Sequence, residues 1–269
     1  MIWTREAEEV VNKVPFFVRR RARLEVEKEA ARQGSDQVLL KHVIDCRQKF
    51  LSGKQSDSKG FQIETCFGSS GCPNRANGSE ELAGDLEKML LSRDIAGFLK
   101  GRTSGELKIH HELRICFSDC PNACSRPQIA DIGIIGAVRP RVVDTCCTGC
   151  STCLPACAED AIHVGAGSAV AIIDASKCVM CGKCIDTCPS GAIEEAEKGW
   201  RILAGGKLGR HPQLGKEMEG IYSKDEAQEI VQRCLDIYFA HNIGGERLGA
   251  ILNRIGYDQV RSSALPEPT

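Results

Sequence analysis

Residues 147–157 read CTGCSTCLPAC, and residues 178–189 read CVMCGKCIDTCP. Both stretches have the spacing C-x2-C-x2-C-x3-C, and a proline follows the second. Three thiolates at this spacing can curl around one iron–sulfur cubane, while the fourth lies beyond the turn and ligates the other cluster. The repeat therefore predicts two adjacent [4Fe–4S] clusters in a bacterial-type ferredoxin insert, with a short strand over residues 169–174 between the two motifs.

Each predicted cluster takes its ligands from both stretches. The first is expected to use Cys147, Cys150, Cys153 and Cys188, and the second Cys157, Cys178, Cys181 and Cys184. Structural zinc is the alternative, but zinc sites use two C-x2-C pairs set well apart and have no use for eight cysteines at this spacing. Cys146 leaves a second register open, although only Cys147 gives the regular spacing. Such a pair of clusters conducts single electrons between a donor and an acceptor.

Charge and hydropathy limit the classes of function. Lys and Arg number 35 against 36 Asp and Glu in 269 residues, so the chain lacks the positive excess of a general nucleic-acid or membrane-surface binder. No stretch approaches the ~18 apolar residues of a membrane span, and the N-terminus has no export-signal pattern. We therefore expect a cytoplasmic protein, in which sixteen bunched cysteines indicate metal rather than disulfides.

The order of helix-like and strand-like segments along the chain predicts an α+β fold. We expect an N-terminal helical domain (1–52) with helices over 6–12, 16–31 and 36–51, then a polar linker over 52–60. Residues 60–142 and 193–262 are expected to form one domain, an antiparallel sheet with helices on one side, interrupted by the ferredoxin insert (143–192).

Several elements of that main domain can be placed. A helix is predicted over 79–98, and strands over 110–117 and 131–138. The sequence from Ser223 to Glu226 is a capping box that opens a helix to about residue 240. A second helix over 246–254 would end at Gly256.

Four more cysteines form a second pattern. Cys66 and Cys72 are a C-x5-C pair, and Cys120 and Cys124 are a C-x3-C pair. Together they supply four thiolates from two loops, which suits a third cubane. Gly68 and Gly71 would let the backbone approach the sulfurs closely.

These motifs resemble the sirohaem-binding half of sulfite and nitrite reductases. The resemblance rests on the C-x5-C pair, CPNAC at 120–124, DIGIIG at 131–136, GGKLGRHP at 205–212 and ERLGAILNRIG at 246–256. It covers about residues 60–260 and is strongest to the small anaerobic and archaeal-type enzymes, which also carry an inserted ferredoxin. It implies a third [4Fe–4S] cluster on Cys66, Cys72, Cys120 and Cys124. It also implies that Cys124 bridges to a sirohaem iron as the axial thiolate.

A sirohaem site must be lined with cations and hydrogen-bond donors, because the macrocycle carries many carboxylates. The residues that the resemblance suggests for it are Asn122, Arg114, Arg126, Lys207, Arg210 and His211. A solvated surface is the alternative for the basic ones. We expect ordinary packing for His110 and His111, and core or spare thiols at Cys46, Cys116 and Cys234.

The first residues resemble a different family. Trp3, EAE at 6–8, VPFFVR at 14–19 and residues 22–34 are similar to the C-terminal helical domain of the light-independent protochlorophyllide reductase B subunit. Sulfite and nitrite reductases also have an upstream ferredoxin-like half-domain, which supplies Arg and Lys to the sirohaem and the oxyanion. No stretch of this sequence resembles that half-domain.

Three functions follow as hypotheses. The first is an oxidoreductase in which an electron donor protein feeds the ferredoxin clusters, a third cluster and sirohaem, where a small anion such as sulfite or nitrite is reduced. The alternative is a sirohaem-free electron-transfer subunit of a larger redox complex. The third is a tetrapyrrole-handling protein. Because the half-domain is lacking, we expect a homo-oligomer or a hetero-complex to complete any catalytic pocket.

Overall fold

The computed structural model describes residues 1–12, 14, 16–56, 58–103, 107–165 and 170–261. The chain divides into two compact units, Met1–Ser58 and Lys59–Thr269. Among the described residues, no helix is both long and apolar enough to cross a membrane.

The N-terminal unit is mainly helical. Its helices are α1 (Arg5–Asn12), α2 (Phe16–Arg32) and α3 (Leu40–Ser56), and a two-residue strand β1 (Ile2–Trp3) pairs in parallel with β2 (Gln37–Val38). Small and β-branched side chains form its core, namely Ala7, Val26, Ala30, Val38 and Val43, with Cys46 packed against them. The third helix starts later than predicted because residues 37–38 extend into β2, and it runs through Ser56 into the stretch predicted as a linker.

The second unit is built on a five-stranded sheet in the order β3-β4-β5-β8-β9. Its strands are β3 (Phe61–Thr65), β4 (Leu113–Ser118), β5 (Ile132–Val142), β8 (Ile193–Ala204) and β9 (Lys216–Glu217). The sheet with its helices confirms the α+β class, but the strand directions differ from the prediction. Strands β3, β4 and β5 are parallel, while β5, β8 and β9 are antiparallel, so the sheet is mixed.

The parallel pairing follows from the long connections, because a parallel strand needs a crossover rather than a hairpin. The connection from β3 to β4 contains α4 (Glu80–Leu91) and α5 (Ile95–Arg102), which replace the single helix predicted over 79–98. Leu82, Leu86 and Leu90 of α4 are fully buried at i, i+4, i+8 spacing. They pack with the apolar residues of the sheet in one core.

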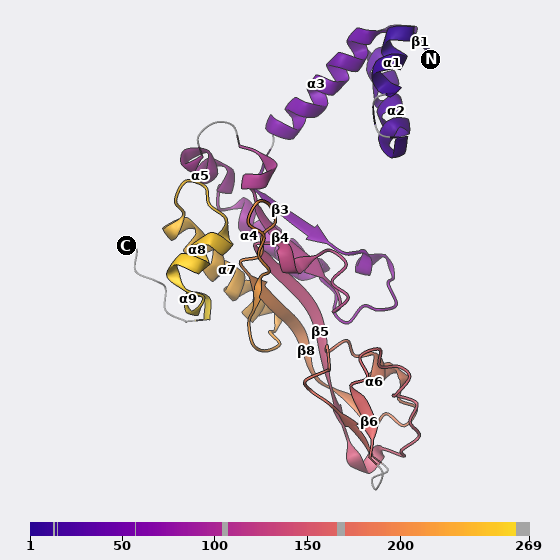
Figure 1. Ribbon diagram of the computed structural model, residues 1–269, viewed down its shortest axis with the longest axis vertical. Helices are drawn as coiled ribbons and strands as arrows, with labels where there is room; N and C mark the ends of the chain where they lie inside the picture. The colour runs from indigo at the N-terminus through magenta and orange to yellow at the C-terminus, as the bar shows by residue number, and fades with distance from the viewer. Residues whose placement is uncertain (13, 15, 57, 104–106, 166–169, 262–269) are drawn as a thin grey trace. The chain divides into compact units, whose positions relative to one another are not determined.

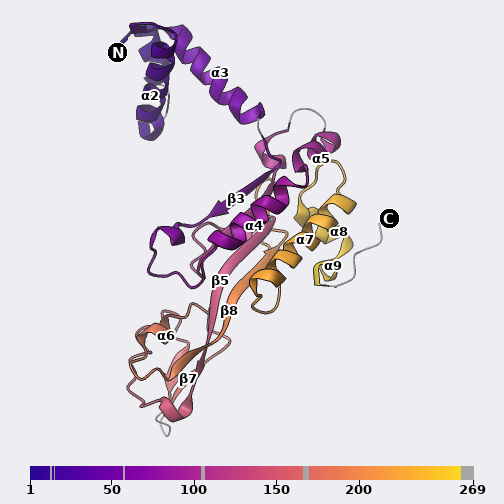
Figure 2. The same ribbon diagram turned by 180° about the vertical axis from the view of Figure 1, so that it is seen from behind.

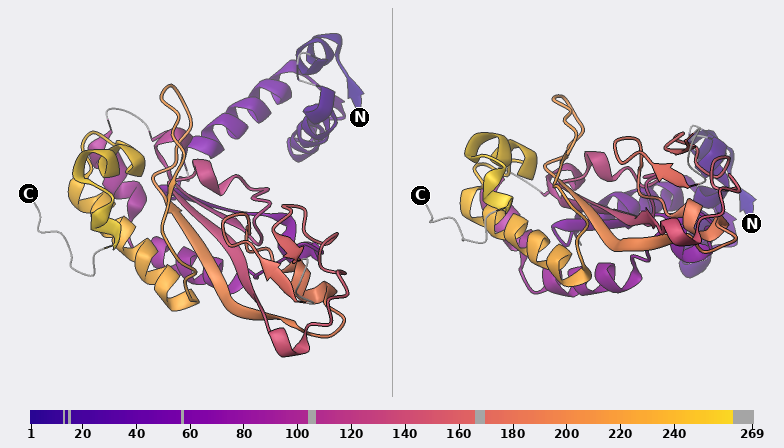
Figure 3. Two further views of the ribbon diagram at one scale, coloured as in Figure 1. Left: turned by 60° about the horizontal axis from the view of Figure 1, so that its bottom comes forward. Right: turned by 90° about the horizontal axis from the view of Figure 1, so that it is seen from below.

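Helix α7 (Lys224–His241) contributes to the same core, so α4 and α7 cover one face of the sheet (Figures 1 and 3). The predicted capping box is confirmed: the Ser223 hydroxyl accepts from the Glu226 N–H, and the Glu226 carboxylate accepts from the Ser223 N–H at 2.8 Å. Cys234 on α7 is fully buried in this core, as predicted. Helix α8 (Leu248–Ile255) ends at Gly256, which has φ 98°, and α9 (Asp258–Arg261) follows.

Residues 143–165 and 170–192 form a separate lobe at the end of the two longest strands (Figures 1 and 2). The pairing of β5 with β8 continues as far as Val142 opposite Ile193. Between these residues lie a two-stranded sheet, β6 (Ile162–Val164) with β7 (Ala171–Ile173), and the short helix α6 (Lys183–Thr187). The short strand expected between the two cysteine motifs is β7.

Candidate metal centres

The first predicted ligand set comes together in the lobe. Cys147, Cys150, Cys153 and Cys188 line one small cavity, although Cys188 comes from the second motif. Burial raises the pKa of the Cys153 thiol, and the neighbouring thiols of Cys150, Cys188 and Cys147 raise it further. Cys147 lines this cavity, whereas Cys146 is exposed and is not among the lining residues.

The second predicted set comes together in the same crosswise manner. A cavity of about 70 Å³ is lined by Cys157 of the first motif and Cys178, Cys181 and Cys184 of the second. Burial raises the pKa of the Cys184 thiol to about 12, and the thiols of Cys181, Cys178 and Cys157 contribute. Such mutual repulsion among thiolates is relieved when they bind a cationic metal core.

The third set lies where two parallel strands end. Because β3 and β4 are parallel, the loops after them leave the sheet at the same edge. The loop after β3 carries Cys66 and Cys72, and the loop after β4 carries Cys120 and Cys124. Burial raises the pKa of the Cys120 thiol, and the thiols of Cys124, Cys66 and Cys72 raise it further. The structure thus brings all four together, with Cys120 buried and Cys124 exposed.

Backbone N–H groups point at several of these sulfurs. The Cys66 Sγ accepts from the N–H groups of Gly68 at 3.4 Å and Asp119 at 3.3 Å. In the lobe, Ala171 N–H donates to Cys147 Sγ at 3.4 Å and Ala161 N–H to Cys157 Sγ at 3.3 Å. Hydrogen bonds of this kind stabilise thiolates and tune the potentials of iron–sulfur clusters.

The donor set fits cubanes better than single ions. Within the described ranges, no three Cys, His, Asp or Glu side chains are arranged to hold one metal ion. A cubane is larger than a single ion, so its four thiolate ligands are spaced more widely around it. Four thiols lining one cavity, twice in the lobe, meet that requirement.

The second set lies against the sheet. Val138 of β5 donates its backbone N–H to the Met180 carbonyl at 2.8 Å, and Val138 and Cys181 form a parallel bridge. Arg201 of β8 donates to the Val179 carbonyl at 3.3 Å. Asn122, from the loop between Cys120 and Cys124, lines the cavity of the second set. The loop of the third set therefore reaches the second set, while the first set lies elsewhere in the lobe.

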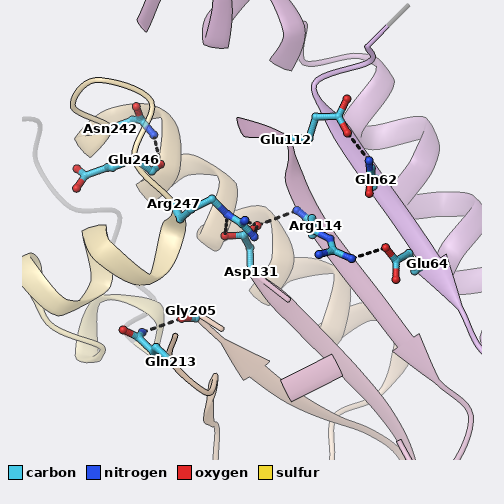
Figure 4. A network of polar contacts seen from close by, with 10 residues as sticks. All are labelled: Gln62, Glu64, Glu112, Arg114, Asp131, Gly205, Gln213, Asn242, Glu246 and Arg247. Atoms are coloured by element: carbon cyan, nitrogen blue, oxygen red, sulfur yellow. Dashed lines mark hydrogen bonds and ion pairs between the residues drawn. The ribbon is translucent and has the colours of Figure 1, made fainter. Parts of the chain in front are cut away.

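Two of the basic residues suggested for sirohaem share a cavity of about 100 Å³. Arg114 and Arg126 line it together with Cys116, Ser125 and Leu208. Arg114 also forms an ion pair with Glu64 at 2.5 Å, while its Nε is buried without a hydrogen-bond partner among the described residues (Figure 4). Cys116 is buried and donates to the Ser125 carbonyl at 2.7 Å, as expected for a spare thiol.

The other suggested residues lie apart from this cavity. Asn122 lines the cavity of the second set instead. Lys207 pairs with Gln213 through two 2.9 Å backbone hydrogen bonds, and these close a hairpin whose tip carries the exposed Arg210 and His211. Within the part of the chain that is described, Leu208 is the residue of this hairpin that lines the cavity.

The paired histidines do not lie on a strand. His110 and His111 belong to a 3₁₀ turn (Ile109–His111), and β4 starts only at Leu113. Their rings stack edge-on with centroids 4.2 Å apart. His111 Nδ1 accepts the Lys108 N–H, and partial burial lowers the pKa of His111. The turn replaces the predicted strand because this side chain caps it.

Sequence reasoning missed the two most deeply buried carboxylates of the described residues, Asp131 and Asp119. Asp131 is fully buried at the start of β5, where Arg247, at the N-terminal end of α8, pairs with both of its oxygens at 2.5–3.1 Å (Figure 4). Asp119 directly precedes Cys120 and is also buried. Neither has a local signal, because the partner of Asp131 lies 116 residues away.

Comparison with known proteins agrees with this geometry. Residues 58–268 match the family described as nitrite and sulphite reductase 4Fe-4S domain, and residues 3–47 match the family described as proto-chlorophyllide reductase 57 kD subunit. The chain is 36% identical over 188 residues to the coenzyme F420-dependent sulfite reductase of Methanocaldococcus jannaschii, covering 69% of this chain and 28% of that protein. It is 27% identical over 160 residues to the beta subunit of the dissimilatory-type sulfite reductase of Archaeoglobus fulgidus, covering 54% and 44%.

The chain thus spans less than half the length of these two relatives. Among solved structures, it shares the fold of dissimilatory sulfite reductase I, with a TM-score of 0.52 at 17% identity, over 86% of this chain and 60% of that one. The match over residues 58–268, on the unit that carries all three sets of thiols, shows that the chain belongs to the nitrite and sulphite reductase 4Fe-4S domain family.

Proposed function

We propose that this chain carries three [4Fe–4S] clusters and passes electrons along them in the order first set, second set, third set. The observation that carries the proposal is the position of Asn122, which belongs to the loop of the third set and lines the cavity of the second. The 2.8 Å hydrogen bond from Val138 to Met180 supports the same order, because it holds the second set against the sheet. The first set makes a suitable entry point, since Cys150 is exposed.

At the end of this path we propose a sirohaem, which supplies the redox chemistry for reducing a small anion such as sulfite or nitrite. Cys124 would hold its iron, because this thiol is exposed whereas Cys120 of the same set is buried. Arg114 and Arg126 would bind its carboxylates, because guanidinium groups pair well with carboxylate. The Nε of Arg114, which is buried without a hydrogen-bond partner in the described part of the chain, is a donor that such a carboxylate would satisfy.

This electron path requires other protein partners at both of its ends. A second copy or another subunit would complete the anion pocket, because the two cavity arginines, Arg114 and Arg126, would bind the sirohaem carboxylates rather than the anion. An electron donor protein would dock beside Cys150. We propose that the N-terminal unit is a separate domain and that the protein works in the cytoplasm.

A second candidate function is a sirohaem-free electron-transfer subunit. It is favoured by the ion pair between Arg114 and Glu64, which already occupies one of the two cavity arginines. It is also favoured by the hairpin of residues 207–213, whose Arg210 and His211 are exposed.

One measurement separates the two candidates. The visible absorption spectrum of protein purified without oxygen should show strong sirohaem bands beside the broad iron–sulfur absorption. Protein with full iron–sulfur content and no sirohaem bands, even when expressed with a sirohaem supply, would contradict the first candidate and support the second. Loss of the sirohaem bands in Cys124→Ser, with the first two clusters retained, would support Cys124 as the residue that holds the sirohaem.

A further inference from the structure

Asp119 connects the two loops of the third set through its backbone. Its N–H donates to the Cys66 Sγ at 3.3 Å, and it directly precedes Cys120. Its carbonyl accepts from the N–H groups of Ala76 at 2.9 Å and Asn77 at 3.0 Å, just beyond Cys72. One residue therefore links the loop of the C-x5-C pair to the loop of the C-x3-C pair.

The side chain of Asp119 is only 2% exposed, and it packs directly against the ligand loop. A Cβ at Gly68 would lie 2.1 Å from Oδ2 and 2.5 Å from Cγ, so glycine is required at that position. Neither carboxylate oxygen has a hydrogen-bond partner among the described residues. A buried carboxylate without hydrogen bonds is costly and needs a counter-charge.

Arg75 provides that counter-charge. Its Nε lies 3.0 Å from Asp119 Oδ2, with the N–H not directed at the oxygen, so the contact is an ion pair rather than a hydrogen bond. The other end of the guanidinium contacts the carboxylate of Glu80, the first residue of α4. A Cβ at Gly78 would lie 2.2 Å from the Nη2 of Arg75, so the chain leaves room for this side chain.

We propose that Arg75 is a positioning residue for the third cluster, and that it sets the cluster's reduction potential by balancing the charge of Asp119. The inference rests on the proposed third cluster. A cubane with four thiolates is anionic, and its potential depends on nearby net charge. A carboxylate buried beside it opposes the addition of an electron, since charges interact strongly away from water. The guanidinium offsets this repulsion and ties the ligand loop to α4.

The test compares charge-changing variants of the full chain in redox titrations followed by electron paramagnetic resonance. The signal lost in Cys66→Ser identifies the third cluster. Arg75→Gln should shift its potential downward and Asp119→Asn should shift it upward, because the two changes alter the local charge in opposite directions. Arg75→Lys, which keeps the charge, should stay near the wild-type value. The potentials of the two clusters in the lobe should not move in any of these variants.

Arg93→Gln is the matched control. It removes a guanidinium that pairs with Asp236 at 3.0 Å and is 35% exposed, against 32% for Arg75, but it lies on the helical side of the unit. This variant should leave all three potentials unchanged.

Shifts of the same sign in Arg75→Gln and Asp119→Asn, or no shift with the third cluster retained, would overturn the inference. Loss of the third cluster from Arg75→Lys as well as Arg75→Gln would also overturn it, since the role would then be structural alone. Wild-type protein without a third cluster would refute the proposed function, and the inference with it. Wild-type protein with three clusters and unshifted variants would refute the inference alone.

Discussion

The backbone N–H of Val138 and the carbonyl oxygen of Met180 are joined by a 2.8 Å hydrogen bond. Val138 is on β5, and Met180 stands between Cys178 and Cys181 with the left-handed φ of 61°. Gly182, also left-handed at φ 76°, packs on the Val138 side chain; a Cβ there would lie 3.2 Å from Val138 Cβ. The loop that carries Cys178 and Cys181 is therefore attached to the central sheet, and this attachment gives the second set its intermediate place in the proposed electron path.

Iron content tests the number of clusters. Three cubanes require about twelve iron atoms per chain, and sirohaem would add one more. We expect this value, with matching acid-labile sulfide, from protein purified without oxygen. A value near eight would remove the third cluster from the proposal.

Cys181→Ser tests the crosswise assignment of ligands. The second cluster should be damaged, because Cys181 lines its cavity, while the first and third clusters share no ligand with it and should remain. Reduction of the third cluster by a donor protein should slow strongly, since the intermediate carrier is lost. Electron paramagnetic resonance and stopped-flow reduction measure the two effects, and Cys146→Ser, which changes an exposed thiol outside the cavities, is the control. Disappearance of all three signals from folded Cys181→Ser would contradict the assignment.

Arg247→Ala should destabilise the second unit severely. The change leaves the fully buried Asp131 without its ion-pair partner, and breaking a buried pair in this way costs about 3–5 kcal/mol. Arg254→Ala removes a more exposed ion pair, with Glu246, from the same helix and should cost below about 1 kcal/mol. Denaturant unfolding gives the free energy of unfolding of the two variants. Equal, small losses of this free energy would show that the buried ion pair contributes little to stability.

Ser223→Ala should weaken the start of α7. The hydroxyl accepts the Glu226 N–H at 3.3 Å, and loss of an N-cap of this kind costs about 1 kcal/mol. Ser223→Asp should restore most of the stability, because aspartate caps equally well. The test is the free energy of unfolding of both variants. If Ser223→Ala and Ser223→Asp lose equal stability, the hydrogen bond of the N-cap does not explain the contribution of Ser223.

Removal of the first 58 residues tests the role of the N-terminal unit. Because Met1–Ser58 is a compact unit with its own core, the truncated chain should keep all cluster signals. If the unit covers a tetrapyrrole, the deletion should shift or bleach the sirohaem bands. Unchanged bands would rule out that role.

The sequence alone was enough for the features that depend on neighbours along the chain. The C-x2-C-x2-C-x3-C repeat implied the crosswise grouping of the thiols in the lobe, because spacing by two residues brings thiolates to one turn. Ser223 and Glu226 predicted the start of α7 for the same reason, since a capping box spans a single turn. The C-x5-C and C-x3-C pairs suggested a third cubane from their spacing, and the resemblance to a known family supported that grouping.

Only the tertiary structure decided how distant segments meet. The sheet is mixed because the long connections before β4 and β5 act as crossovers, and hydropathy alone does not report strand direction. Asn122 reaches the second set rather than the cavity of Arg114, because Val138 brings the lobe to that loop. Arg247 pairs with Asp131 although 116 residues separate them in the chain. Arg75, in the loop after β3, pairs with Asp119, in the loop after β4. Such pairs depend on how the loops and helices pack, since no local pattern of residues encodes a contact between charges so far apart in the chain.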